Sequence, residues 1–563
     1  MEFRGMASPP GGNRFRLRYP LMALMASVVL YLVLATSIAR TKAPWCDEGW
    51  FANPAYNLAF HGNMGSNVLE PSGHFLNAYL QGIRERTYVI TANHLVGLAG
   101  WFRVVGFSLF AMRLYSILWG AVTLLVLFYI LRRLFPDHRV AYFATLLTAM
   151  DFVFVWGTAD GRMEAPAGAL ALCSLAAYLH FRERNYRTAI LLSQIFGAAA
   201  VFTHPNALIV LLAVFVLAWR YDRDRIRPRQ LVLAAVPYLI FGLLWAVYIL
   251  QAPSDFMAQF FANAAGRESS RWKVVLQPWL AVYGEVLRHL ATYMVSGLWS
   301  AAMNPPMLVI PFIYLAATIG FLRRRKLYEM PTRMFVACLV TVLAGMTFLN
   351  GFKAPCYMLY AIPFYNAVLA AWLLILWDRK GDAGGVAVCL GAAFAVLQLS
   401  TSIQHIRADE YARDYQPAVR AVEDYRAAGR TIVGTSALGF GAGFRGFTDD
   451  WRLGLYSGLK PDVIVMDRSY RDFTLRFEED EPAVFSHVVA TLNSEYRLAQ
   501  RHGSFWIFER VSTPGAKTVP RIDIRSVVTK GKAERADYIF ELLLASSLTQ
   551  SARESHAHNE TNF

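Results

Sequence analysis

Residues 21–51 of this 563-residue chain read LMALMASVVLYLVLATSIARTKAPWCDEGWF. The apolar run from Leu21 to Ile38 approaches the roughly 20 residues that a helix needs to cross about 30 Å of hydrocarbon. A basic head precedes this run and no clear small-residue cleavage site follows it, so we expect a retained helix rather than a signal peptide. Two carboxylates, Asp47 and Glu48, come directly after it among tryptophans. The stretch predicts a membrane helix with an acidic pair at one surface of the bilayer.

The same apolar character recurs along the chain. Ten further runs lie at 108–131, 139–157, 164–181, 188–203, 205–219, 231–250, 304–322, 334–350, 357–377 and 386–403. Pro205 lacks an N–H and disfavours helix in the residue before it, so a tight hairpin is expected around Thr203-His204-Pro205. The chain is 56% hydrophobic and 17% charged, whereas soluble proteins carry about 25% charged residues. This composition excludes a disordered chain and a disulfide scaffold, and we expect a mainly α membrane protein with about eleven transmembrane helices.

Lysine and arginine set the expected orientation. Of the 34 Lys and Arg before residue 404, 22 lie in six segments: 1–20, 132–139, 181–187, 219–230, 321–333 and 378–385. Basic loops stay in the cytoplasm, so the N-terminus should be cytoplasmic and the long loops 39–107 and 251–303 should lie outside. Residues 404–563 hold 21 Lys and Arg against 22 Asp and Glu, although the whole chain has a net charge of +15. The positive excess is therefore a topology signal, and no nucleic-acid partner is expected.

The chain divides into four expected parts. A basic cytoplasmic N-terminus, 1–20, precedes a transmembrane catalytic domain, 21–403. Residues 404–512 alternate strand-like runs, such as 462–466, with helix-like runs punctuated by glycines, which is typical of a small α/β domain. We expect this domain on the extracytoplasmic side. A linker, a short helix and a disordered polar tail are expected over 513–563.

The Asp47–Glu48 pair has two interpretations. Like charge and partial desolvation both raise a carboxylate pKa, which suits a general base. The alternative is structural: Asp47 would cap a helix and Glu48 would occupy its first turn, where the helix dipole favours acidic residues.

A second charged segment lies in the short turn between the third and fourth predicted spans. It contains Asp160, Arg162 and Glu164. Ionisable groups near membrane depth are costly, so they usually face a cavity or a partner. A site for an anionic, lipid-linked substrate is one interpretation, and an ion pair of Arg162 with Asp160 or Glu164 is the other. The basic-loop pattern puts this turn on the same side as Asp47.

These residues resemble a known family. The Asp47-Glu48 pair, the run 101–114 (WFRVVGFSLFAMRL), the turn 161–165 (GRMEA) and Thr203-His204-Pro205 occur in the order found in the GT-C superfamily of integral-membrane glycosyltransferases. The branch most similar is the family 39-like one, which includes protein O-mannosyltransferases and the aminoarabinose transferase of lipid A. The resemblance covers roughly residues 20–400 and implies a GT-C-type helix bundle with interfacial helices in the first outer loop.

The resemblance also implies a reaction. Such enzymes transfer a sugar (the hexosyl and pentosyl transferase class) from a polyprenyl-phosphate carrier to an acceptor hydroxyl, with inversion, outside the cytoplasm. By this resemblance Asp47 is the base and Glu48 orients the base or the acceptor. Glu164 helps bind acceptor or sugar, and Arg162 neutralises the acids or holds phosphate. An alcohol needs deprotonation as it attacks, and cations stabilise the departing phosphate. No nucleotide-binding loop is present or needed.

Several other residues are candidates for substrate binding. Asp160, His94 and His204 lie on the predicted outer side, as do the basic residues Arg267, Arg271, Lys273 and Lys353. The basic residues would bind phosphate, or alternatively anchor to lipid headgroups. His94 stands near the family's Lys-Pro-Pro element, which is absent here, so that lysine's role is not carried over; His94 supplies a polar contact or caps a helix.

No metal is assigned. His61, His74, His94 and His204 could approach Asp47 and Glu164, but their spacing matches no metal signature; a divalent cation stays an option.

We therefore expect a multi-pass glycosyltransferase of a bacterial inner membrane. Its partners would be the lipid bilayer, a polyprenyl-phosphate sugar and a lipid, glycan or protein acceptor. The rival readings are a flippase for a polyprenyl-linked glycan and a non-catalytic sugar-lipid binding protein. A transporter should show repeats or broken helices near mid-membrane, whereas the polar residues here cluster at one face, which favours an enzyme.

Overall fold

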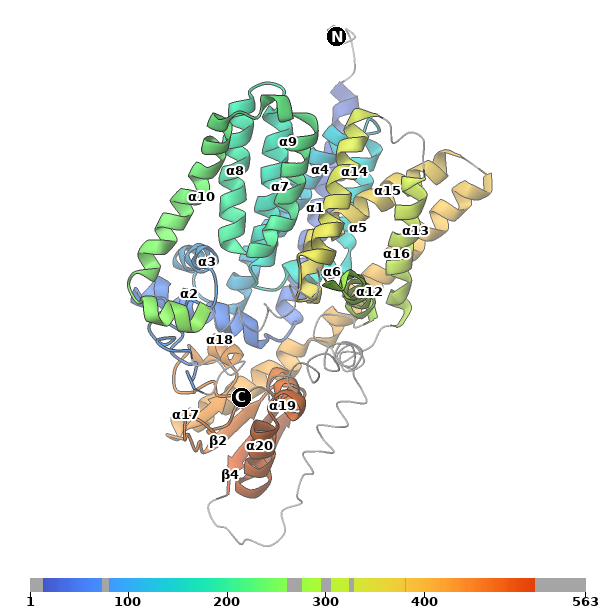
Figure 1. Ribbon diagram of the computed structural model, residues 1–563. Coiled ribbons are helices and arrows are strands. Elements are labelled where there is room, and N and C mark those ends of the chain that lie inside the picture. Colours follow the sequence, from blue (N-terminus) through green and yellow to red (C-terminus); the bar gives the residue numbers. More distant parts are fainter. Residues whose placement is uncertain are drawn as a thin grey trace.

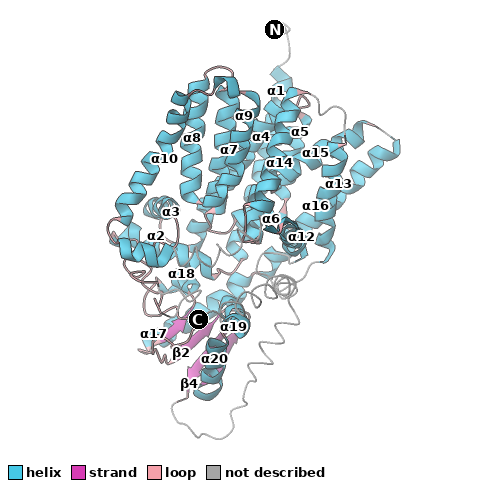
Figure 2. Ribbon diagram, in the orientation of Figure 1, coloured by secondary structure: helices cyan, strands magenta, loops and turns pink. Residues whose placement is uncertain are grey.

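The computed structural model describes residues 14–72, 80–260, 276–294, 305–323, 329–379 and 381–511. Most of them are helical, and a small sheet lies beyond one end of the helix bundle (Figure 2). The helices of the bundle and its surroundings are α1 (Arg14–Thr41), α2 (Cys46–His61), α3 (Ala92–Val105), α4 (Leu109–Leu134), α5 (Arg139–Met150), α6 (Phe152–Thr158), α7 (Glu164–Phe181), α8 (Tyr186–Thr203), α9 (Leu208–Tyr221), α10 (Pro228–Ile249), α12 (Pro278–Met294), α13 (Val309–Leu322), α14 (Met330–Phe348), α15 (Ile362–Asp378) and α16 (Gly381–Ala408).

Within the described residues, every predicted apolar run overlaps at least one helix. Among the described residues six helices are long and apolar enough to cross a membrane, or seven if the bent pair α5–α6 forms one span. Three shorter apolar helices lie at 205–221, 306–322 and 362–378. The expected hairpin is present, because α8 ends at Thr203 and α9 starts at Leu208. The count of eleven spans stays a prediction.

One predicted span is broken. Residues 139–157 were expected to form one helix, but α5 and α6 meet at an angle of 63°. Asp151 lies at the break and accepts a hydrogen bond from the Phe154 backbone N–H at 3.0 Å. Its carboxylate also accepts from Tyr314 Oη at 2.6 Å. Asp151 therefore caps α6 and starts a new helix where hydropathy alone predicts a continuous one.

The bundle has two distinct ends. Figure 1 shows the N-terminus at one end and α2, α3 and the sheet at the other. The connections between α4 and α5, between α9 and α10 and between α15 and α16 are short, and they belong to the segments predicted to be cytoplasmic. Helix α1 begins at Arg14, inside the head predicted as 1–20.

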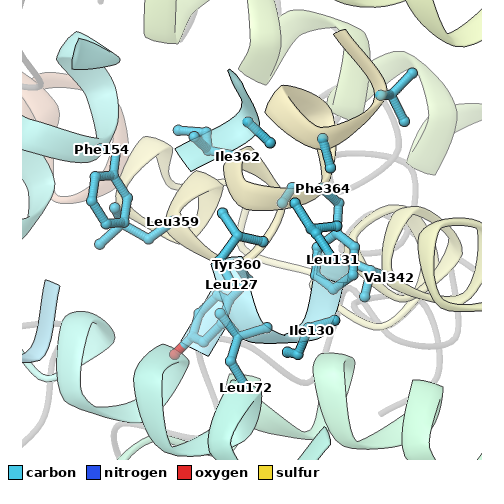
Figure 3. Close-up of a cluster of buried hydrophobic side chains, with 14 of the residues drawn as sticks. Leu127, Ile130, Leu131, Phe154, Leu172, Val342, Leu359, Tyr360, Ile362 and Phe364 are labelled. Atoms are coloured by element: carbon cyan, nitrogen blue, oxygen red, sulfur yellow. The ribbon is translucent and has the colours of Figure 1, made fainter. Parts of the chain in front are cut away.

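The core of the bundle lies between α4, α6, α7, α14 and α15. Figure 3 shows side chains from these helices meeting, including Leu127, Leu131, Phe154, Leu172 and Phe364. Leu131 is fully buried. Lipid tails are as apolar as leucine, so close packing rather than water exclusion holds these helices together.

The C-terminal segment is an α/β structure. It contains α17 (Gln416–Ala427), α18 (Gly439–Ala442), α19 (Arg468–Asp480) and α20 (Pro482–Glu495) with strands β1 (Ile432–Gly434), β2 (Val463–Met466), β3 (Tyr496–His502) and β4 (Phe505–Arg510). The sheet order is β1-β2-β4-β3. β1 and β2 are parallel and the other pairs are antiparallel.

This α/β segment is continuous with the bundle. Helix α16 runs to Ala408, so the predicted boundary at residue 404 lies inside a helix. Buried residues of α2 and α3, among them Phe51 and Leu98, share one hydrophobic cluster with Val422 of α17 and Ile507 of β4. The first predicted outer loop and the C-terminal segment therefore fold against each other.

We predict that Leu131→Ala lowers the unfolding free energy by about 2–5 kcal/mol, because it leaves a cavity in a packed core. Leu125 lies on the same helix and is 44% exposed, so Leu125→Ala is the control. The thermal midpoint in detergent should fall for the first variant only; equal midpoints would contradict the assigned core.

Candidate active site

Glu48 is held by a buried ion pair. Arg113, one turn into α4, donates from Nε and Nη2 to the two Glu48 carboxylate oxygens at 2.7 Å each. Both side chains are 0% exposed. Burial alone would raise the pKa of Glu48, but the Arg113 guanidinium outweighs burial and holds that pKa below its usual range. Such a forked pair is strong and directional.

The same pair ties three elements together. Arg113 Nη1 donates to the carbonyls of Ala39, at 2.8 Å, and Lys42, at 2.7 Å, where α1 ends. The Glu48 carboxylate accepts from the Trp45 backbone N–H at 3.3 Å and so caps α2. Glu48 therefore lies in the first turn of a helix, as the structural interpretation expected, and an arginine holds it there. The N-cap position is occupied by Trp45 and not by Asp47.

Asp47 belongs to a second ion cluster. Arg162, from the turn before α7, donates from Nη1 to Asp47 and from Nε and Nη2 to Glu164 at 3.0 and 2.6 Å. The Asp47 side chain is 20% exposed, whereas that of Glu164 is 1% exposed. The guanidinium carbon also lies 5.0 Å from the centre of the Trp45 ring and 5.6 Å from that of the Phe51 ring, within the range of cation–π attraction. The structure therefore brings Asp47, Arg162 and Glu164 together, as the sequence suggested.

The electrostatics of this cluster favour a basic carboxylate. Burial raises the pKa of Asp47, and Glu164 raises it further, although Arg162 opposes both effects. With both acids ionised the three residues carry a net charge of −1. Such a cluster does not attract phosphate, so Arg162 is better suited to hold the two carboxylates than to bind the donor.

Asp160 is not part of the cluster formed by Asp47, Arg162 and Glu164. It pairs with Lys42, and the two side chains are 1% and 4% exposed. Burial raises the pKa of Asp160 and lowers that of Lys42, while each partner's charge opposes the shift. Lys42 Nζ lies 4.2 Å from the Trp156 ring. This pair clamps the end of α1 to the turn that carries Arg162.

The two histidines are buried nearby. His94 of α3 is 1% exposed, and neither ring nitrogen has a hydrogen-bond partner among the described residues. Burial lowers the pKa of His94 to about 4, so it is neutral at pH 7. His204 follows the end of α8, and its Nδ1 accepts from the Asn206 backbone N–H at 3.1 Å.

Of the predicted phosphate ligands, the structure describes only Lys353. Lys353 is 8% exposed and donates to the carbonyls of Met346 and Thr347 and to Glu285, so it caps the end of α14. Burial lowers the pKa of Lys353 to about 8. Arg267, Arg271, Lys273 and His74 lie outside the described residues. Within the described part of the chain, no three His, Cys, Asp or Glu side chains are grouped to hold a metal ion.

A groove of about 680 Å³ opens where the C-terminal end of α2 and helices α3, α8 and α10 approach the loop 84–86. Its polar lining includes Arg84, Arg86 and Asn93, and its apolar lining includes Phe202 and Trp245. Asn93 is adjacent in sequence to the buried His94. The groove is amphipathic, and its two arginines are each paired with an acid, Arg84 with Glu70 at 2.6 Å and Arg86 with Glu85 at 3.4 Å.

Sequence reasoning missed the partners that organise these residues. Arg113 lies in the family-like run but had no assigned role, Lys42 was not singled out, and the contact between Cys356 Sγ and Arg162 Nη2, at 3.6 Å, was not predicted. A usable signal existed for Arg113, because a charged residue one turn inside an apolar span requires a partner.

Replacing Arg113 alone should lower the stability of the protein more than replacing both Arg113 and Glu48. Arg113→Met leaves the Glu48 carboxylate buried and unpaired, at a cost of about 3–5 kcal/mol. The double variant Arg113→Met/Glu48→Met should recover part of that loss in a thermal unfolding measurement. Arg132→Met, an exposed position on the same helix, serves as the control; a double variant no better than the single one would contradict the pairing.

Known proteins share this architecture. Residues 97–248 match the family model for dolichyl-phosphate-mannose-protein mannosyltransferase. The chain is similar to the structure of ArnT from Cupriavidus metallidurans bound to undecaprenyl phosphate, with 13% identity, a TM-score of 0.51 and coverage of 89% of this chain and 99% of that one. It is also similar to the apo oligosaccharyltransferase of Archaeoglobus fulgidus, with 12% identity, a TM-score of 0.49 and coverage of 86% and 70%. No curated protein matches the sequence.

The family match spans the segment from α3 to α10 and includes Arg113, Arg162, Glu164 and His204. At 13% identity the first structural likeness shows a shared fold, and the apolar helices show a multi-pass membrane protein. Over residues 97–248 the chain is therefore similar to the dolichyl-phosphate-mannose-protein mannosyltransferase family, and its fold is like that of the ArnT structure.

Proposed function

We propose that this protein transfers a sugar from a polyprenyl-phosphate carrier to an acceptor hydroxyl, at the extracytoplasmic face of a bacterial inner membrane. One observation carries the proposal. Asp47 keeps 20% side-chain exposure, while Glu48 and Glu164 around it are 0% and 1% exposed. A carboxylate held by arginine but open to one side is suited to accept a proton from a bound alcohol.

The reaction is a single displacement. The acceptor oxygen attacks the anomeric carbon as the bond from that carbon to the phosphate oxygen breaks. The electron pair leaves with polyprenyl phosphate, and the acceptor proton passes to Asp47. Attack from the face opposite the leaving group inverts the anomeric carbon. A raised Asp47 pKa makes this carboxylate a stronger base.

The surrounding charges would position this base. Arg162 is fixed by its two bonds to Glu164, so its third donor holds Asp47 in one orientation. Glu164 would act through Arg162 and contact the acceptor or the sugar only after rearrangement, because it is nearly fully buried. Glu48 would act on the base indirectly, as the adjacent anchored residue of α2.

The amphipathic groove is the proposed site of the lipid-linked substrate. A polyprenyl phosphate has an apolar chain and an anionic head, and the groove offers Phe202 and Trp245 beside Arg84 and Arg86. The neighbouring ArnT structure contains undecaprenyl phosphate, which supports a carrier of this class. Arg267, Arg271 and Lys273 stay further candidates for the phosphate, and the acceptor is a lipid, a glycan or a protein.

The break between α5 and α6 bears on the flippase alternative. A transporter would place a broken helix against a cavity. Asp151, at this break, is 0% exposed and its oxygens are occupied by Tyr314 and the Phe154 N–H. The Phe152 N–H donates to Gln398 at 2.8 Å. The break is packed, which favours the enzyme over the transporter.

Asp47→Asn should slow the release of free polyprenyl phosphate by at least about 100-fold, the usual contribution of a general base. The measurement is lipid chromatography after mixing purified protein with donor lipid and acceptor. Asp137→Asn, at the other end of the bundle with 41% side-chain exposure, should retain activity. Full turnover by Asp47→Asn would rule out the base assignment.

Activity should also depend on pH with a definite sign. The base must be deprotonated, and burial raises the pKa of Asp47. The value of kcat/KM should therefore fall as pH drops through that raised pKa, at a pH above the usual aspartate value of about 3.9. A profile flat down to pH 4 would contradict Asp47 as the base.

Arg86→Ala should raise the KM for the lipid donor about tenfold, because it removes a charged contact worth about 1.5 kcal/mol, and should leave kcat nearly unchanged. Arg103→Ala, an exposed position on α3, is the matched control. An unchanged KM would exclude Arg86 from the donor site.

A further inference from the structure

Helix α2, whose first turn carries Asp47, rests on the C-terminal α/β segment. Figure 1 shows α2 against α18, and α2 also contacts the turn Ser436–Leu438. This turn follows β1, and Asp467 follows the parallel neighbour β2. The carboxyl ends of parallel strands lie at one edge of a sheet, and α2 packs against this edge. In many α/β folds the residues that bind ligands lie at the same edge.

The backbones of the two segments are in direct contact. A Cβ added at Gly49 would lie 2.4 Å from the Ser436 carbonyl carbon and 2.6 Å from the Ala437 nitrogen. No side chain fits there, so glycine is required for this close approach. Gly49 is two residues from Asp47, so this contact fixes the distance between the first turn of α2, which carries Asp47, and the end of β1.

A hydrogen bond fixes the rotation of the same turn. Trp50 Nε1 donates to Asp449 Oδ2 at 3.2 Å, and the Trp50 ring lies 5.0 Å from that of Trp451. Asp449 is fully buried. Its Oδ2 also accepts from Ser436 N at 2.8 Å and Ser436 Oγ at 2.5 Å, and its Oδ1 accepts from Tyr470 Oη at 2.9 Å.

The backbone of Asp449 is anchored independently. Its N–H donates to the Val68 carbonyl at 2.7 Å, and its carbonyl accepts from the Glu70 N–H at 2.9 Å. One residue thus joins the first predicted outer loop, the end of β1 and the start of α19 to Trp50. Every described donor to its carboxylate is a neutral group, so the bonding network orients α2 rather than neutralising a charge.

We propose that Asp449 and Trp50 are positioning residues that hold the first turn of α2, and with it Asp47, in reacting geometry. The inference rests on the proposed function of Asp47. It makes the α/β segment a structural part of the reaction centre, rather than a separate module that recruits an acceptor. A shift of about 1 Å in a reacting group can cost about 100-fold in rate, so the loss of one bond at this point has a kinetic consequence.

The first test replaces the donor. Trp50→Phe keeps an aromatic ring but removes the N–H, and should lower kcat about tenfold or more with the KM for the lipid donor unchanged. Trp506→Phe is the matched control, because Trp506 lies in the same hydrophobic cluster and its Nε1 has no hydrogen-bond partner among the described residues. Asp449→Asn should show the same loss of kcat. Asp462→Asn, on the same segment, is its control and should keep the wild-type kcat.

A second readout does not depend on turnover. Cys46 adjoins Asp47 and is 3% exposed, so it reports the docking of this turn. Full-length protein in detergent is treated with a soluble maleimide, and Cys46 modification is followed by peptide mass spectrometry. Modification should be faster in Trp50→Phe and Asp449→Asn than in wild type, and unchanged in Trp506→Phe.

The outcomes separate the two proposals. Wild-type kcat and wild-type Cys46 protection in Trp50→Phe overturn the positioning role, and so does an equal kcat loss in Trp506→Phe. If wild-type protein has no transferase activity, the proposed function fails, and the maleimide measurement alone decides the docking: faster modification supports it and unchanged modification overturns it. If Asp449→Asn does not fold, the kcat and the Cys46 modification rate of Trp50→Phe test the positioning role by themselves.

Discussion

The buried ion pair between Arg113 and Glu48 is the constraint on which the rest of the site depends. Two charges removed from water are stable only when their hydrogen bonds are satisfied, and Arg113 meets this condition by binding Glu48 and the carbonyls at the end of α1. The pair therefore determines where α1 stops, where α2 starts and how α4 lies beside them. Asp47 directly precedes Glu48 in α2, so the same ion pair also fixes the position of Asp47.

The other ion pairs extend this arrangement. Lys42 clamps the end of α1 to Asp160, and Arg162 holds Asp47 and Glu164. Three cationic side chains thus organise four carboxylates within one small region at the end of an apolar bundle. Charges at such an interface attract strongly because the local dielectric is low, and for the same reason each needs its own partner. The result is a rigid site in which Asp47 stays open to one side.

The α/β segment contacts α2 on the side away from the helix bundle and so supports the turn that carries Asp47. Its core merges with the buried faces of α2 and α3, and the Trp50–Asp449 contact reaches the turn that carries Asp47. The sequence pattern predicted strand-like runs such as 462–466, and β2 lies at Val463–Met466. It did not predict β3 or α19, because β3 is largely exposed and polar and α19 is rich in charge, so neither shows an apolar pattern. The break at Asp151 was missed for a related reason: a single capping residue changes a helix without changing its mean hydropathy.

The sequence by itself determined which segments are apolar helices, which loops share a side and which acidic and basic residues lie near that side. These properties follow from composition and local order, because membrane helices satisfy their own backbone and must be apolar. Only the tertiary structure decided the partners. Glu48 turned inward to Arg113, Asp160 to Lys42 and Lys353 to a helix end, while Asp47 kept its exposure. Pairing depends on distances between residues such as Trp50 and Asp449, about 400 positions apart, and no local pattern in a single sequence encodes such a distance.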